Sequence, residues 1–170
     1  TYDSRDFMLN ASRGWFMQLD LTTNPTFLGN NNTYWSAELQ LATYRKAWRG
    51  AIIAGELHTR QSTGQVPWPM LADVGSSNRM RGYYEGRYRD KNVIDAQVEL
   101  RQHIWHRNGI VLWLGAAEVF PRYSDMRFSR ILPNAGVGYR WQFKKGVNVR
   151  LDYGFSRNGT GFIFNINEAF

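Results

Sequence analysis

Apolar and polar residues alternate along most of this 170-residue chain, and this pattern limits the possible folds more than any other feature. Successive side chains of a β-strand point to opposite faces, so alternation is typical of a strand with two unlike faces. In VNVRLDYGFS, residues 147–156, the large apolar side chains take the odd positions and the polar ones the even positions. Helical periodicity is almost absent. The sequence therefore predicts an all-β fold.

Eight such segments follow one another, each about as long as a tilted membrane strand of ~9–11 residues. The predicted strands span residues 14–23, 34–46, 50–62, 93–105, 109–120, 134–144, 147–156 and 160–170. Their connections alternate in length, with short turns at one rim and longer loops at the other, as in an antiparallel up-and-down barrel. We expect a single domain over residues 1–170, in which 64–92 is a long inserted loop.

The apolar face of such a sheet can meet either of two solvents. In a soluble barrel the apolar side chains point inward, whereas in an outer-membrane barrel they meet lipid and the polar side chains line the lumen. Aromatic residues stand near strand ends with aliphatic residues between them, as at Trp35, Trp141 and Phe170. Aromatic side chains concentrate at membrane–water interfaces. The pattern therefore favours a transmembrane barrel, with Arg150 and Asp152 in its polar lumen.

The composition argues against several classes of function. The formal net charge is +7, but the basic residues are scattered along the chain, so nucleic-acid binding is not predicted. A chain without cysteine has neither a disulfide scaffold nor a thiolate metal site. No segment approaches the length of about 18 apolar residues that a transmembrane helix needs. Because the chain opens on Thr1 and not on Met, we expect a mature or partial chain.

Three motifs resemble those of a known family. RMRGYYEG, residues 79–86, lies in the longest connection, and NAGVGYRW, residues 134–141, precedes the last hairpin. RLDYG, residues 150–154, is followed by a final strand that closes on the aromatic Phe170. In order and spacing these motifs resemble the bacterial surface-antigen superfamily, the BamA–TamA group of outer-membrane β-barrels. The resemblance extends over nearly the whole chain.

The resemblance implies a position for the arginine-rich loop. In this family the loop folds back into the barrel, and its motif, here Arg81, Gly82 and Tyr83, meets acidic residues on the inner wall. An arginine enclosed in a lumen loses hydration and needs a carboxylate partner. Glu99 stands where the family places one such acid. We therefore expect an ion pair between Arg81 and Glu99.

The sequence departs from the family pattern at a second position on the inner wall. Gly115 stands where the family has an aspartate, and Glu118 could replace that acid only if the strand register differs. The two residues of the loop motif that follow Arg81 have simpler expected roles. Gly82 permits a tight turn with positive φ, and Tyr83 packs against the wall.

The resemblance also implies which part of a barrel the chain forms. A family barrel has sixteen strands, with the motif loop before the last five; here five predicted strands follow the loop and three precede it. We therefore expect the second half of a sixteen-stranded barrel, whose first half is missing or supplied by another chain. A closed eight-stranded barrel is the alternative, but side chains fill such a barrel and leave little room for a long loop.

By resemblance the protein acts in the outer membrane of a Gram-negative bacterium, in the insertion or translocation of other proteins, without cofactors or catalytic residues. Its final strand would form a weakly paired seam that can exchange partners. The expected residues of this C-terminal β-signal and seam are Gly161, Phe162, Phe164, Ile166 and Phe170. Expected partners are outer-membrane lipid and other outer-membrane or periplasmic proteins.

Two other functions fit an outer-membrane barrel. One is a structural barrel that anchors a partner or a fused domain, and the other is a lipid-modifying enzyme with a Ser/His/acid cluster near one rim. His58, His103 and His106 lack the spacing of metal ligands, so no metal site is predicted. Asp95 and Glu99 share one polar face, as a catalytic carboxylate pair would, but structural lumen charges are expected there.

Overall fold

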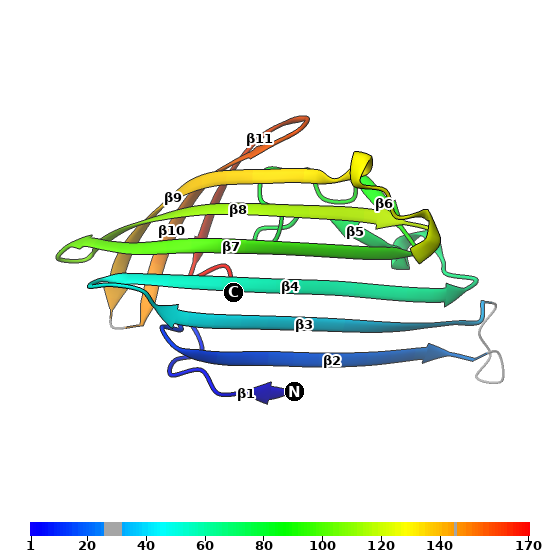
Figure 1. Ribbon diagram of the computed structural model, residues 1–170, viewed down its shortest axis with the longest axis horizontal. Helices are drawn as coiled ribbons and strands as arrows, with labels where there is room; N and C mark the ends of the chain where they lie inside the picture. Colours follow the sequence, from blue (N-terminus) through cyan, green and yellow to red (C-terminus); the bar gives the residue numbers. More distant parts are fainter. Residues whose placement is uncertain (26–31, 145) are drawn as a thin grey trace.

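The computed structural model describes residues 1–25, 32–144 and 146–170, so the connection between the first two predicted strands lies mostly outside the described residues. Within them, long antiparallel strands form one sheet in the order β1-β2-β3-β4-β7-β8-β9-β10-β11 (Figure 1). These strands are β1 (Tyr2–Asp3), β2 (Gly14–Asn24), β3 (Tyr34–Lys46), β4 (Ala51–Gly64), β7 (Asn92–Trp105), β8 (Asn108–Phe120), β9 (Leu132–Lys144), β10 (Val147–Ser156) and β11 (Gly159–Ile166). The eight predicted strands are all present, and the short β1 adds to them at one edge.

The sheet is open. β2, β3, β4, β7 and β8 run side by side, β9 follows beside β8 and then bends, and β10 and β11 lie behind them (Figure 1). Among the described residues, β1 and β11 stand at the two edges, and neither pairs with the other. The alternative of a closed eight-stranded barrel is therefore wrong for this structure, and the strands form an open barrel segment.

The two faces of the sheet follow the predicted alternation and have the polarity of a membrane barrel. Leu114 and Phe164 on the outer face are 70% and 66% exposed, whereas Arg150 and Asp152 on the inner face are both 0% exposed. A soluble barrel requires the opposite, with apolar side chains packed inside and charges in water. No helix among the described residues is long and apolar enough to span a membrane.

The long loop between β4 and β7 covers the inner face. It contains a 3-10 turn, η2 (Trp68–Met70), and a small hairpin of β5 (Ala72–Val74) and β6 (Tyr88–Asp90) that alternation did not predict. Buried apolar residues of the loop and of the wall form one cluster: Ala72, Val74, Met80, Tyr83, Val93, Ala117 and Leu132. The loop is thus packed against the wall as part of the fold.

The last strand is shorter than predicted. β11 ends at Ile166, and Asn167 has a φ of +72°, so the chain leaves the sheet there. Residues 160–170 were expected as one strand with Phe170 on its apolar face. Instead Phe170 turns to the inner side and packs against Tyr44 of β3, with ring centroids 6.2 Å apart.

Candidate functional site

The loop enters the lumen along a row of three glycines that begins beside Trp113. Trp113, Gly136, Gly154 and Gly161 are paired in register across β8, β9, β10 and β11. The indole ring of Trp113 lies over Gly136, where a Cβ atom would overlap it. The loop backbone lies over the other two glycines, so a methyl group on either would meet loop atoms. At these three positions only glycine leaves room for the Trp113 ring and the loop backbone.

Gly82 completes this close approach from the side of the loop. Its φ is +102°, and a Cβ atom there would lie 2.7 Å from the carbonyl oxygen of Gly154. An L-residue is disfavoured at this φ, and the contact leaves no space for a side chain. The tight turn expected at Gly82 is therefore present, and it brings Arg81 onto the inner wall.

Arg81 is the centre of the site. Its side chain is 0% exposed, and its guanidinium forms the expected ion pair with Glu99 of β7, which is also fully buried. A second amino group of Arg81 lies 2.7 Å from Asp152 Oδ2 on β10. The guanidinium carbon stands 3.7 Å from the ring centroid of Trp113. Arg81 thus has a carboxylate on each side and an aromatic face against it, a cation–π arrangement.

Each carboxylate is shared with further arginines. Arg101 lies 2.9 Å from Glu99 Oε2, and Arg140 forms an ion pair with Asp152. Arg150 Nε stands 3.6 Å from Asp152, and its Nη2 donates a 2.8 Å hydrogen bond to the carbonyl oxygen of Ser77 in the loop. Buried charges need such compensation because leaving water costs each of them several kcal/mol. The cluster therefore joins the loop to β7, β9 and β10.

The end of the chain contributes to the same cluster. Glu168 accepts hydrogen bonds from Arg140 Nε at 2.8 Å and from Asn148 Nδ2 at 2.7 Å. Burial raises the pKa of this carboxyl, but the positive charges of Arg101 and Arg140 lower it more, so its pKa lies below the usual value. The carbonyl oxygen of Phe170 accepts a 2.9 Å bond from Arg101. Residues 167–170 are thereby held inside the barrel segment.

Tyr83 lies at the entrance of the loop. It is buried, and its hydroxyl donates to the carbonyl oxygen of Pro133 at 2.7 Å and accepts from the backbone N–H of Arg157 at 3.3 Å. Burial raises the pKa of this phenol, so it stays protonated and able to donate. Tyr83 therefore packs against the wall, as expected, and also ties the loop to the turn between β10 and β11.

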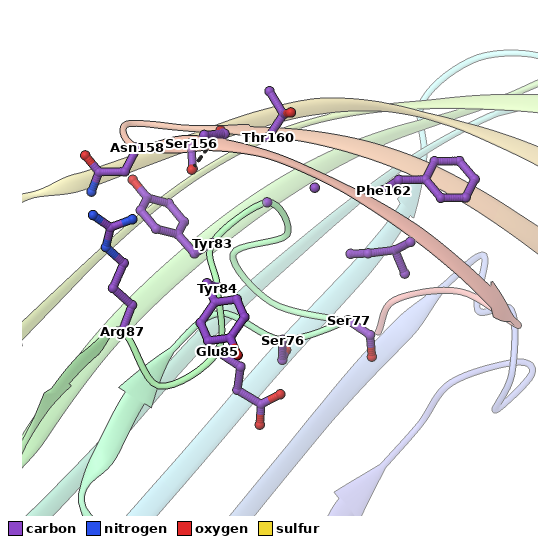
Figure 2. A pocket seen from close by; sticks show the side chains of 14 residues that line it. Ser76, Ser77, Tyr83, Tyr84, Glu85, Arg87, Ser156, Asn158, Thr160 and Phe162 are labelled. Carbon is purple, nitrogen blue, oxygen red and sulfur yellow. Dashed lines mark hydrogen bonds between the residues drawn. The ribbon is translucent and has the colours of Figure 1, made fainter.

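A pocket of about 410 Å³ separates the rest of the loop from the terminal hairpin (Figure 2). Tyr84, Glu85 and Arg87 line it from the loop, and Thr160 and Phe162 line it from β11. It adjoins β11, the strand at the edge of the sheet. Residues of the loop and of the edge strand therefore line the same pocket.

The residues that the sequence analysis assigns to the β-signal and seam divide into two groups. Phe162, Phe164 and Ile166 point outward and are 56–66% exposed, and Gly161 lies under Gly82. Phe170 is the exception, because the chain turns inward after Ile166. The residues of β11 that we expect at a seam thus lie on the faces that the alternation predicts.

The acid that replaces the family aspartate is not the one considered from the sequence. Glu118 lies on the outer face of β8 and accepts a hydrogen bond from the backbone N–H of Arg127, whereas Arg81 lies on the inner face. Asp152 takes the second position beside Arg81 instead. Gly115 leaves room for the loop, because a Cβ atom there would stand 3.4 Å from Met80 Sδ.

Sequence reasoning missed four members of the cluster: Trp113, Arg101, Arg140 and Glu168. The first three lie on inner faces, so alternation marks them as lumen residues without identifying their partners.

The histidines form no common site. His58 lies between Asp95 and Glu38, at 2.7 Å and 2.9 Å, while His103 and His106 are exposed near a turn.

Comparison with known proteins gives a consistent family and fold. Residues 1–170 match the model of the family described as the Omp85 superfamily domain. Among solved structures, the fold is similar to that of BamA from Haemophilus ducreyi lacking POTRA domains 1-3, with a TM-score of 0.75 and 14% sequence identity. The match covers 97% of this chain and 40% of that chain, so this chain spans about two fifths of its length. No curated protein matches the chain.

Proposed function

This chain belongs to the Omp85 superfamily, and we propose that its terminal strand β11 is a seam where strands of other outer-membrane proteins pair during insertion or translocation. The chain is a BamA/TamA-like outer-membrane barrel protein. The proposal concerns what its barrel does there. It rests on one observation, the unpaired edge of β11.

β11 pairs with β10 over the whole of its length and, among the described residues, with no strand on its other side. A row of free backbone N–H and C=O groups is a template to which another strand can add. Its outward side chains, Phe162 and Phe164, suit a lipid-facing partner. An incoming strand would therefore find hydrogen bonds and a matching apolar face together.

The loop fixes this edge from the inside. Gly82 contacts Gly154 and Gly161 on the two strands of the terminal hairpin, and Tyr83 binds the turn between them. The loop therefore contacts both strands and the turn of the terminal hairpin from the inner side. We infer that the Arg81 cluster holds the seam in a form ready to accept a partner.

The lumen groups favour a non-enzymatic role. His58 is 4% exposed, and both of its ring nitrogens face carboxylates, so neither is available to a substrate. Glu99 is fully buried between arginines and cannot exchange protons with a substrate. Their contacts are those of structural charges.

Cysteine cross-linking tests the proposal, because the chain contains no cysteine of its own. Phe164→Cys on β11 would be combined with a nascent outer-membrane barrel protein that has one cysteine in its last strand. The matched control is Leu112→Cys, which is outward and 48% exposed on the central strand β8. Paired strands bring Cα atoms within about 4.5–5.5 Å, which permits a disulfide.

We expect adducts with the cysteine on β11 and none above background with the cysteine on β8. Equal yields from Phe164→Cys and Leu112→Cys would mean that contact is random and that β11 is not a seam. Absence of any adduct during active insertion would equally contradict the proposal.

A further inference from the structure

The connection between β8 and β9, residues 121–131, folds over the outer wall. Glu118 faces outward, because it is paired with the outward Ile94 of β7, yet it is only 4% exposed. Its carboxylate accepts a 2.8 Å hydrogen bond from the backbone N–H of Arg127 in this connection. Phe120 is fully buried, with its ring 5.0 Å from that of Tyr123. The connection therefore covers the end of β8 on the lipid-facing side.

A groove of about 420 Å³ lies between this connection and the wall. Its floor includes Ala96 and Ala116, which are paired across β7 and β8 and leave a hollow because both are small. Met126 and Phe128 line it from the connection, and Phe128 is 93% exposed. The groove is predominantly apolar and continues into the lipid-facing outer surface of the strands.

Three arginines lie in the same connection, each next in sequence to a residue that lines the groove. Arg122, Arg127 and Arg130 are all exposed, and Asp125 is the one acid between them in the sequence. In the described part of the chain, no ion pair or side-chain hydrogen bond engages their guanidinium groups. Longer loops of outer-membrane barrels lie at the extracellular rim, where the apolar band of the wall ends. Free guanidinium groups at that level match phosphate, which they bind in a bidentate manner.

We propose that this groove and the three arginines of the connection bind one phosphate-bearing lipid of the surrounding leaflet, with an acyl chain over Ala96 and Ala116 and the phosphate at the arginines. The occupant is a lipid because the groove opens on the lipid-facing wall and continues its apolar surface. Its head group is anionic because the connection that forms one side of the groove carries three exposed arginines, and none of them has an ion-pair partner among the described residues. The exposed ring of Phe128 would then lie among acyl chains, where its exposure costs nothing.

Native mass spectrometry of the protein in neutral detergent micelles tests this site. The probe is phosphatidic acid, and phosphatidylcholine with the same chains is the lipid without net charge. The variant Arg122→Gln, Arg127→Gln, Arg130→Gln removes the cations. The matched control, Arg45→Gln, Lys46→Gln, Arg49→Gln, removes the same charge from exposed residues at the end of β3 and in the β3–β4 turn, at the opposite rim. Ala116→Phe fills the hollow without a change of charge.

Each cation near a membrane surface contributes about 1 kcal/mol, or roughly fivefold, to binding of an anionic lipid. We expect the loop variant to retain phosphatidic acid at least ~10-fold more weakly, the control variant to bind within about twofold of the parent protein, and Ala116→Phe to lose binding as well. Heat-modifiable gel migration reports whether each variant is folded. If the triple variant does not fold, Arg127→Gln alone should weaken binding by roughly fivefold.

Four results would overturn the site. Equal retention of phosphatidic acid and phosphatidylcholine would remove the role of the arginines, as would equal losses in the loop and control variants. Displacement of the lipid by glycerol 3-phosphate at equal concentration would reduce the site to an adventitious ion only. Unchanged binding in Ala116→Phe would show that no acyl chain occupies the groove.

Discussion

Replacement of Arg81 by alanine should release the loop from the lumen while leaving the strands paired. Removal of one partner of a buried ion pair costs about 3–5 kcal/mol when the remaining charge is left alone. Here the remaining charges are not alone, because Glu99 keeps Arg101 and Asp152 keeps Arg140. We therefore expect the lower end of that range, about 3 kcal/mol, with the lost contact to Trp113 included.

This loss of stability increases the fraction of molecules in which the loop is locally open. Since about 1.4 kcal/mol corresponds to a factor of ten, a loss of about 3 kcal/mol raises the open population roughly a hundredfold. Cleavage by chymotrypsin at Tyr84 tracks that population when opening is fast relative to cleavage. Arg87→Ala is the matched control, because Arg87 lies in the same loop and is exposed. The rate in Arg81→Ala should rise about a hundredfold, and in the control by less than about threefold.

A double-mutant cycle tests whether the stability lost in Arg81→Ala comes from the ion pair of Arg81 with Glu99. Arg81→Ala and Glu99→Gln remove the same ion pair, so their effects on cleavage should be strongly non-additive, with a coupling of about 1–3 kcal/mol. Additivity within about 0.5 kcal/mol would mean that the two side chains stabilise the loop independently. A rate in Arg81→Ala equal to that in Arg87→Ala would refute the account of the loop altogether.

The remaining predictions concern packing, pH and the membrane. Gly136→Ala should displace the indole ring of Trp113 and lower stability by about 1–3 kcal/mol, measured as the thermal midpoint, whereas Gly55→Ala, where an added Cβ meets its nearest neighbour at 3.6 Å, should cost less. Because the pKa of Glu168 is lowered in the folded protein, its contribution is present above the unfolded pKa and disappears as pH falls through the folded one. The difference in midpoint between the parent and Glu168→Gln should therefore be large at pH 7 and vanish in strong acid; a constant difference would contradict the contact with Arg140. The protein in detergent should show heat-modifiable gel migration, and migration that does not change on heating would count against a stable barrel.

Local pattern was sufficient to predict the strands and their faces. Side chains at alternate positions point to opposite faces whatever the rest of the chain does, so Arg150 and Asp152 were expected in the lumen and are there. The pair of Arg81 and Glu99 came from the resemblance, since no local rule connects a loop residue to a strand 18 positions away. The same limit explains why Asp152 was not recognised as the second partner of Arg81, because the curvature of the sheet decides which inner residues meet.

The end of β11 shows how tertiary contacts override alternation. The sequence from Phe162 to Phe170 continues the apolar period, yet the strand stops at Ile166. Glu168 finds Arg140 and Asn148 inside, and Phe170 finds Tyr44. A carboxylate gains more from buried arginines than from a position at the edge of a sheet, so the chain turns inward.

Glu118 reveals a second way in which a local rule fails. Its position in β8 puts it on the outer face, where a charge would meet hydrocarbon unless something covers it. The connection of residues 121–131 supplies that cover and also a donor, the backbone N–H of Arg127. Glu118 also lines the groove between this connection and the paired Ala96 and Ala116. The departure from alternation at Glu118 therefore marks the place on the outer wall where the proposed lipid site lies.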